Sequence, residues 1–240
     1  MKATTAMPPA LSEAQAREEI CRVGASLFAR GYVHATAGNI SVRLDDGCLI
    51  TPTDACLGFL EPARLARVNR EGQQTGGDHA SKTLALHRAI YQATAAAGEP
   101  CSCVIHTHST HCVALSLLTQ GDELLPALTP YFVMKVGHVP LVPYHRPGDP
   151  AAAAWVAQAI AAWAARGAPL RAVMLSRLGP SVWHNTPAAA MATLEELEET
   201  ARLHLLTAHR PASNAVAGPG LQALDPAQID ELRQTFGARW

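Results

Sequence analysis

Short apolar segments with strand character alternate with helical segments along most of this 240-residue chain. The first helix is clearly marked, because Ser12 and Gln15 match a capping box, apolar residues follow at helical spacing, and Gly31 ends it. Two apolar segments then flank the Asp-Asp-Gly sequence at 45–47, which is a strong signal for a tight β-hairpin. Interleaved strands and helices favour an α/β sandwich, and the early hairpin makes its sheet mixed.

The same pattern predicts the remaining elements. We expect strands at 40–44, 48–51, 101–106, 132–136, 139–142, 172–175 and 181–183. We expect further helices at 82–97, 111–119, 151–165 and 187–208, and a loop at 72–80. A last short helix is capped by Asp225, has Pro226 at its first position and closes at Gly237. We therefore expect one domain over 1–209, then a linker (210–221) and a short C-terminal helix within 210–240.

Charge and composition narrow the class of protein. Nineteen Lys and Arg residues stand against 20 Asp and Glu residues, a formal net charge of -1, so the chain lacks the basic excess that binds nucleic acid or an anionic membrane. No segment is apolar enough to span a bilayer, and the first ten residues lack the apolar region of a signal peptide. Six cysteines in such a chain fit reduced thiols. We expect a soluble cytoplasmic protein with small-molecule partners.

A His-Thr-His motif ends the strand predicted at 101–106. Alternate side chains on a strand share a face, so His106 and His108 project together, about 7 Å apart along it. Two imidazoles placed in this way can both reach one metal ion. The same alternation places Cys101 and Cys103 on the opposite face, which disfavours a mixed Cys/His site. The simpler alternative is a pair of histidines with ordinary hydrogen bonds at a strand end.

The lysines give a second signal. The chain has only three, and Lys82 and Lys135 lie inside motif-like segments. Lys82 follows Ser81 at a predicted helix start, where free backbone N–H groups favour a phosphate or carboxylate. An ordinary Ser N-cap followed by a solvated lysine is the alternative. Gly38 and Asn39, before the hairpin, can bring a backbone and an amide close to a ligand or can form a tight turn.

These segments, taken in order, resemble the class II aldolase/adducin family. The likeness rests on GNISVRLDDGCLITPT, SKTLALHRAIY, VIHTHSTHCVALS, TPYFVMKVGHVPLVPYHRPGD and LEELEETARLHLL, between about Leu11 and Leu206. The TPY…RPGD stretch and EELEETA are most similar to the 3-oxo-tetronate 4-phosphate decarboxylase group. The resemblance implies a single-domain, three-layer α/β/α sandwich with a mixed, largely antiparallel sheet. It also implies a divalent metal (usually zinc), a homotetramer with sites between subunits, and small phosphorylated sugar acids as substrates.

The functional residues of the family carry over in part. Its two metal-binding histidines of the His-x-His motif are present as His106 and His108. Its phosphate pocket uses the positions occupied here by Asn39, Ser81 and Lys82.

Other family positions are substituted. Thr83 replaces the glutamate that serves as catalytic acid/base, and Leu178 replaces the third metal-binding histidine. Asp54 replaces a glycine of the phosphate pocket, Ala80 replaces a proline, and Arg177 adds a positive charge beside the metal position. A threonine is no carboxylate base, and the loss of general-base catalysis typically slows a reaction by about 10²–10⁴-fold.

Two functions follow from this mixture. The family role is a metal-dependent lyase that releases CO₂ from a 3-oxo sugar acid phosphate through a metal-stabilised enediolate. Decarboxylation needs an electron sink more than a base, so it tolerates Thr83 better than an aldol cleavage does. The alternative is a catalytically impaired or repurposed relative that binds a ligand or acts in an assembly, or one with an unphosphorylated substrate. His79 and His184 are candidates to replace the missing metal ligand.

Overall fold

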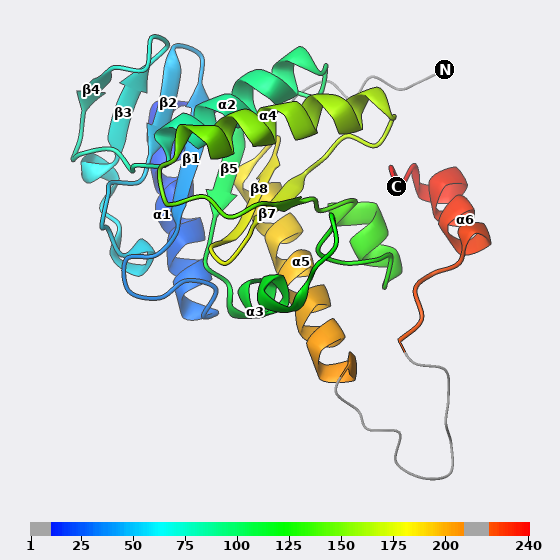
Figure 1. Ribbon diagram of the computed structural model, residues 1–240. Coiled ribbons are helices and arrows are strands. Elements are labelled where there is room, and N and C mark those ends of the chain that lie inside the picture. The colour runs from blue at the N-terminus through cyan, green and yellow to red at the C-terminus, as the bar shows by residue number, and fades with distance from the viewer. Residues whose placement is uncertain (1–10, 209–220) are drawn as a thin grey trace.

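The computed structural model describes residues 11–208 and 221–240 (Figure 1). Its centre is an eight-stranded sheet in the order β4-β3-β2-β1-β5-β8-β7-β6. Neighbouring strands run antiparallel except β6 and β7, so the expected mixed, largely antiparallel sheet is confirmed. The strands are Asn39–Leu44 (β1), Gly47–Ile50 (β2), Ala66–Asn69 (β3), Gln74–Gly76 (β4), Cys103–His106 (β5), Leu141–Val142 (β6), Ala172–Leu175 (β7) and Gly179–His184 (β8).

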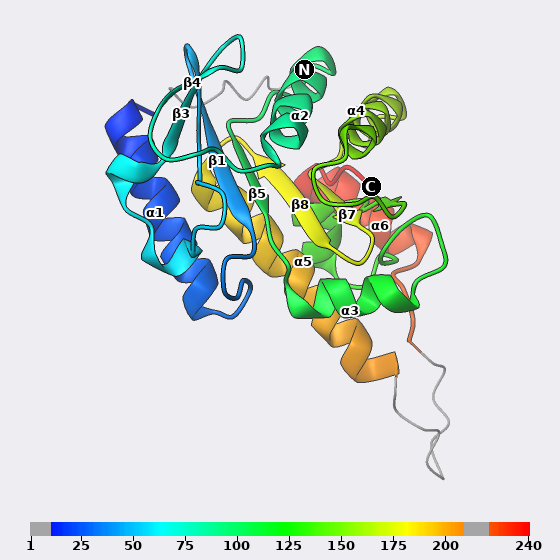
Figure 2. The ribbon, with the colours of Figure 1, turned by 60° about the vertical axis from the view of Figure 1, so that its left-hand side comes forward.

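Helices cover both faces of the sheet and give the expected three layers (Figure 2). One face carries α1 (Glu13–Ala29), α3 (Thr110–Leu118) and α5 (Pro187–Ala208), and the other carries α2 (Leu84–Ala96) and α4 (Pro150–Ala165). Alternating strand residues feed the two apolar cores: Ile105 lies in the core under α1 and α5, and Val104 lies in the core under α2 and α4. This is the arrangement that period-two strands between helical layers require.

Local sequence signals explain where several elements begin and end. Ser12 caps α1 with both halves of a capping box, and Gly31 follows the helix at φ +74°. The Asp-Asp-Gly turn joins β1 to β2, with Leu44 opposite Gly47. Asp225 caps α6 (Pro226–Phe236) in the same way as Ser12, and Gly237 closes that helix in the left-handed conformation. These predictions are confirmed.

The strand expected at 132–136 is wrong. These residues form a short π-helix, η3 (Phe132–Val136). Phe132, Val133 and Val136 are the buried ones, a helical spacing rather than the alternation of a strand. Thr129 starts the turn, because its hydroxyl accepts from the Phe132 N–H at 3.1 Å and its carbonyl accepts from the Val133 N–H at 3.1 Å. Packing against α5 and α6 has overridden the β-propensity of this segment.

Two other expectations change in detail. The loop expected at 72–80 contains the short edge strand β4, and the strand expected at 139–142 shortens to β6. The linker predicted at 210–221 lies outside the described residues except for its last one. Beyond it, α6 packs on η3 through Leu232 and Val133.

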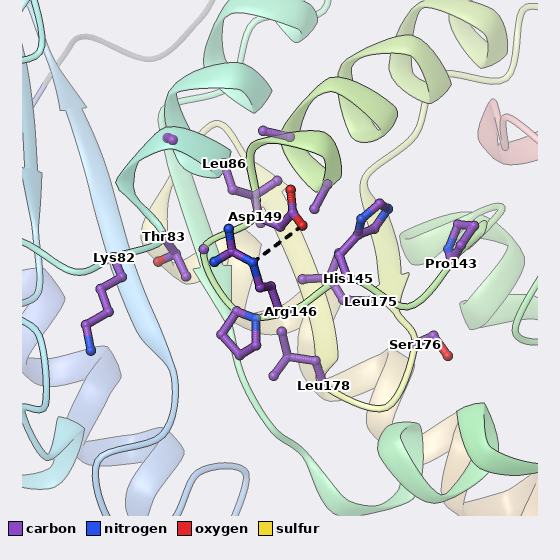
Figure 3. Close-up of a pocket in the computed structure, with 15 residues that line it drawn as sticks. Lys82, Thr83, Leu86, Pro143, His145, Arg146, Asp149, Leu175, Ser176 and Leu178 are labelled. Atoms are coloured by element: carbon purple, nitrogen blue, oxygen red, sulfur yellow. Dashed lines mark ion pairs between the residues drawn. The ribbon is translucent and has the colours of Figure 1, made fainter.

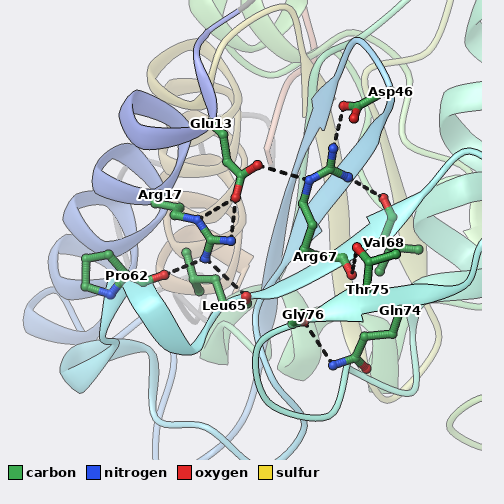
Figure 4. A network of polar contacts seen from close by, with 10 residues as sticks. All are labelled: Glu13, Arg17, Asp46, Pro62, Leu65, Arg67, Val68, Gln74, Thr75 and Gly76. Atoms are coloured by element: carbon green, nitrogen blue, oxygen red, sulfur yellow. Dashed lines mark hydrogen bonds and ion pairs between the residues drawn. The ribbon is translucent and has the colours of Figure 1, made fainter.

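A polar network fastens α1 to the edge of the sheet (Figure 4). The guanidinium of Arg67 on β3 lies 3.2 Å from the Glu13 carboxylate and also pairs with Asp46 in the hairpin turn. Glu13 in turn accepts from Arg17, whose Nη1 donates to the carbonyl of Pro62 at 2.6 Å. The Arg67 side chain is largely buried, but Glu13 and Asp46 are exposed, so each ion pair contributes little on its own, as surface pairs usually do.

All six cysteines are free thiols. Within residues 11–208 and 221–240, no helix combines the length and the apolar character needed to cross a membrane.

Candidate active site

His106 ends β5 at the centre of the sheet and is 1% exposed. Its Nδ1 lies 3.0 Å from the carbonyl oxygen of Pro180 and 3.1 Å from the Ser181 hydroxyl on β8. A carbonyl can only accept, so Nδ1 carries the proton in the neutral ring and Nε2 keeps its lone pair. Burial, with smaller effects from His108 and His87, lowers the pKa of His106 to about 3. The ring is therefore neutral at pH 7, and the lone pair of Nε2 can bind a metal ion.

His108 lies beside it, as the sequence predicts. The two ring centroids are 5.1 Å apart at an interplanar angle of 70°. Burial, and then the proximity of His34, lowers the pKa of His108. A zinc–nitrogen bond of about 2.0–2.1 Å puts each ring centroid about 3.2 Å from the metal, so two tetrahedral imidazole ligands have centroids about 5.2 Å apart. The observed separation fits two ligands of one metal ion.

The third family ligand is absent in space as well as in sequence. Leu178 lies in the β7–β8 turn and packs on the apolar core beneath α2 and α4. The next residue, Gly179, approaches so closely that a Cβ there would be 1.9 Å from the carbonyl oxygen of Thr107. This turn thus lies against the His-Thr-His segment, but the side chain of its residue 178 is the isobutyl group of leucine, which cannot bind a metal. As they stand, no three His, Cys, Asp or Glu side chains in the described part of the chain form a metal-holding group.

Neither histidine proposed as a substitute ligand is placed for that role. His184 lies at the far end of β8, opposite Cys103, whereas His106 is opposite Ser181. Three steps along β8 therefore separate His184 from the residue opposite His106, a distance of about 10 Å along the strand. His79 is exposed and lines a different pocket with Asp54.

A histidine that the sequence analysis overlooked is closer. His34 lies in the loop between α1 and β1, and its ring centroid is 6.4 Å from that of His108. No sequence spacing connects it to the motif at 106–108, because the approach depends on how the loop folds back.

The expected face of one cysteine is wrong. Cys103 belongs to the core on the α1 side, whereas His106 is directed toward His87 on α2, so this pair lies on opposite faces as predicted. Cys101 instead packs in the core beneath α2, where it is 3.4 Å from the Thr94 hydroxyl. The alternation fails there because β5 begins only at Cys103.

The structure brings Asn39 and Ser81 into the same region. Asn39 is the direct partner of His106 across β1 and β5, and its buried Oδ1 has no hydrogen-bond partner among the described residues. Thr51 connects the two segments, because its N–H donates to the Ile40 carbonyl at 3.0 Å and its carbonyl accepts from the Ser81 N–H at 3.2 Å. Backbone pairing thus sets the Ser81 segment alongside the end of β1.

Ser81 is not the helix cap that the sequence suggested. Helix α2 begins at Leu84 with Thr83 as its N-cap residue. The Ser81 hydroxyl lies 3.0 Å from that of Thr83 and accepts from the Thr83 N–H at 3.4 Å. Lys82 between them is exposed. Hydroxyl and ammonium groups therefore lie just before a helix N-terminus, where an anion is favoured.

A pocket connects the start of α2 with the start of α4 (Figure 3). Thr83 and Leu178, the two substituted family positions, both line it, together with Lys82 and Arg146. Among the described residues, the Arg146 guanidinium makes a single long ion pair, 3.9 Å from Asp149, so it can also bind a ligand. The sequence analysis quoted Arg146 within the RPGD segment but did not assign it to the site.

Two further substituted positions share an unusual backbone conformation. Asp54 has φ +55° and Arg177 has φ +64°, so both adopt the left-handed conformation. The glycine expected at position 54 suits this conformation, and aspartate is one of the residues that tolerates it best. Asp54 is exposed and lines a pocket with Thr53 and His79. The fold is preserved there while the charge changes.

Behind the histidine pair lies a buried polar chain. His87 on α2 is fully buried, and its Nδ1 is 2.7 Å from the Ser41 hydroxyl, which is 2.7 Å from the Tyr91 hydroxyl. Burial lowers the pKa of His87 to about 3. Its Nε2 has no partner in the described part of the chain. The chain provides a neutral, polar backing to the site.

Comparison with known proteins matches this geometry to a family. Residues 18–205 match the model of the class II aldolase and adducin N-terminal domain. A Cupriavidus necator protein named 3-oxo-tetronate 4-phosphate decarboxylase is 54% identical over 231 residues, covering 95% of this chain and 99% of that protein. A Pectobacterium atrosepticum protein of the same name is 42% identical, covering 83% of this chain and 88% of the relative.

Solved structures give the same result. A structure from Escherichia coli described as YgbL, a putative aldolase/epimerase/decarboxylase, has a TM-score of 0.78 at 40% identity, covering 92% of this chain and 99% of that one. L-fuculose-1-phosphate aldolase from Thermus thermophilus has a TM-score of 0.68 at 28% identity, covering 82% of this chain and 97% of the aldolase. With its three-layer fold and central histidine pair, this chain belongs to the class II aldolase/adducin family.

Proposed function

We propose that this protein is a metal-dependent lyase that decarboxylates a 3-oxo-tetronate 4-phosphate. The observation that carries the proposal is the pair of neutral imidazoles of His106 and His108, whose 5.1 Å separation suits one metal ion. The shared name of relatives that are 42–54% identical supports the substrate class. His106 and His108 would hold the metal, and we propose zinc, one of the ions that imidazole ligands suit.

The residues of the site have separate roles in this proposal. A divalent metal, when bound, supplies Lewis-acid polarisation of the substrate carbonyl. Asn39, the Ser81 hydroxyl and the Lys82 ammonium bind the phosphate before the first turn of α2. Arg146 lines the pocket beside Lys82, and its guanidinium can pair with a carboxylate or a phosphate of the substrate.

The reaction itself explains how the site can lack a carboxylate base. The C1–C2 bond of the 3-oxo acid breaks, C1 leaves as CO₂, and its electron pair moves through C2 onto the C3 carbonyl oxygen. A proton from water then adds at C2 and gives a three-carbon hydroxyketone phosphate. No proton has to be removed from carbon before the bond breaks, so Thr83 does not block this step. An aldol cleavage, in contrast, needs a base for the substrate hydroxyl.

A second candidate function rests on the two substitutions in the pocket. The Thr83 hydroxyl is engaged with Ser81, and Leu178 presents carbon where the family has a ligand. These features favour a catalytically impaired relative that binds the sugar acid phosphate, alone or within an assembly.

One assay separates the two functions. Purified protein supplied with Zn²⁺ or Mn²⁺ is incubated with 3-oxo-tetronate 4-phosphates, and CO₂ and the hydroxyketone phosphate are quantified. The lyase predicts stoichiometric formation of both products, loss of activity in His106→Ala, and retention in His184→Gln, whose side chain lies at the other end of β8. Binding of the acid phosphate without CO₂ release supports the second function instead.

Three further proposals accompany the lyase. We propose a homotetramer, as the family resemblance implies, and the molar mass measured by light scattering after size-exclusion chromatography tests it. We propose a cytoplasmic location, which the six free thiols support. We also propose that residues 1–209 form the family domain and that 210–240 are an appendage, which a deletion of 210–240 tests through stability and activity.

A further inference from the structure

The histidine pair leaves a metal centre one ligand short. Catalytic zinc sites usually have three protein ligands and keep a fourth position for water or substrate. His106 and His108 supply two, and Leu178 cannot supply the third. If the proposed metal binds tightly, another side chain has to complete the set.

The loop between α1 and β1 folds directly against the histidine pair. Val33 is buried, with 3% exposure, and the Ala37 N–H donates to the His34 carbonyl at 2.9 Å, which closes a tight turn. Gly38, at φ +84°, then approaches so closely that a Cβ there would be 2.9 Å from the carbonyl oxygen of His106. The next residue pairs with His106 across the sheet. The fold therefore anchors both ends of the loop and holds His34 beside the pair.

The ring distances place His34 close to His108. The 5.1 Å between the His106 and His108 centroids already matches the value of about 5.2 Å for two tetrahedral ligands. The His34 and His108 centroids are 6.4 Å apart, an excess of about 1.2 Å over that value. His34 is exposed, so its side chain can change rotamer without leaving a packed core.

We propose that His34 is the third protein ligand and forms, with His106 and His108, a three-imidazole site for a divalent metal such as zinc. The inference rests on the proposed metal dependence and adds the residue that replaces the ligand lost at Leu178. The remaining candidates are worse placed, because His184 lies at the far end of β8 and His79 lines a separate pocket. The fourth position stays open for water or substrate.

The test measures metal binding rather than activity. Metal-free full-length protein is titrated with Zn²⁺ by competition against a chelating dye, and with Co²⁺, whose visible absorption reports the ligand set. We expect one metal per chain in the wild type, and an affinity at least about 100-fold weaker in His34→Ala, since loss of an outer-shell partner alone typically weakens binding 10–100-fold. His79→Ala removes another exposed histidine and should bind like the wild type.

A second variant distinguishes loss of a metal ligand from loss of the fold. Residue 178 directly precedes Gly179, which lies against the Thr107 carbonyl, so Leu178→His in the His34→Ala background should return the affinity to within about tenfold of wild type, with a changed Co²⁺ spectrum. Thermal unfolding of metal-free His34→Ala should match the metal-free wild type, because the side chain is exposed.

The outcomes separate this inference from the proposed function. Loss of metal in His106→Ala but not in His34→Ala overturns the role of His34 and leaves the lyase intact. Metal binding that depends on His34, in a protein that releases no CO₂, supports the site and overturns the lyase. A folded wild type that binds neither Zn²⁺ nor Co²⁺ overturns both.

Discussion

Glu198 on α5 holds the segment that carries the histidine pair, and its replacement by glutamine should measurably destabilise the fold. The carboxylate is 4% exposed and accepts from the backbone N–H groups of His111 at 2.9 Å and Cys112 at 3.0 Å. A third contact, 2.8 Å, joins it to His111 Nδ1. Helix α3 begins only two residues after His108 and has no cap from its own Ser109 side chain, so Glu198 supplies that cap from another helix.

The magnitude follows from these bonds. A hydrogen bond to a charged group contributes about 1 kcal/mol more than a neutral one, so two backbone bonds make Glu198→Gln less stable by about 2 kcal/mol at pH 7. The matched control is Glu199→Gln. In the described part of the chain, the half-exposed Glu199 side chain makes one ion pair, 3.6 Å from Arg202, so its replacement should change stability by less than about 0.5 kcal/mol.

The effect of pH has a definite sign. Burial raises the pKa of Glu198, but the hydrogen bonds from His111 and Cys112 outweigh it, and the net pKa lies below the ordinary value of 4.5. A lowered carboxyl pKa stabilises the fold above the unfolded-state value, and this contribution disappears as the pH falls through the folded-state value. Urea unfolding should therefore show the full gap between wild type and Glu198→Gln at pH 7 and a closing gap below pH 4.5. A gap under about 0.5 kcal/mol at pH 7, or one that widens in acid, would refute the capping role.

Two other predictions concern packing and thiol access. Gly179→Ala should destabilise the fold by at least about 3 kcal/mol in urea unfolding and weaken metal binding, because the added Cβ would overlap the Thr107 carbonyl. The control Gly167→Ala has open space around it and should lose only about 1 kcal/mol. Equal losses of stability in the two variants would contradict this prediction. In the native protein a thiol reagent should react with only two of the six cysteines, Cys21 and Cys56, because the others are buried, and burial raises the pKa of Cys101 to about 12. Rapid reaction of all six in folded protein would show that the cores open.

Much of the fold could be predicted because local signals and tertiary packing agree. The capping box at Ser12, the hairpin at 45–47 and the cap at Asp225 each act within a few residues, and the structure contains all three. The π-helix at 132–136 could not be predicted, since its apolar residues suit a strand and only packing against α5 and α6 favours the helical turn.

The same distinction between local signals and tertiary packing applies to the site. The proximity of His106 and His108 follows from strand alternation within three residues, and the structure places them together. His34 lies more than seventy residues away in the chain and approaches only because the loop before β1 folds back over the end of β5. The EELEETA segment was visible as a motif, but the capping role of Glu198 depends on how α5 packs against α3. Neither the approach of His34 to His108 nor the cap from Glu198 to α3 can be predicted from sequence spacing.

The central claim is that the histidine pair holds a divalent metal, and its most direct test is the metal content of purified wild-type protein and of His106→Ala. We predict one zinc or other divalent ion per chain in the wild type after equilibration with metal and removal of the excess, and none in His106→Ala, with both proteins folded by circular dichroism. A wild type that is folded and metal-free after the same treatment would contradict the account.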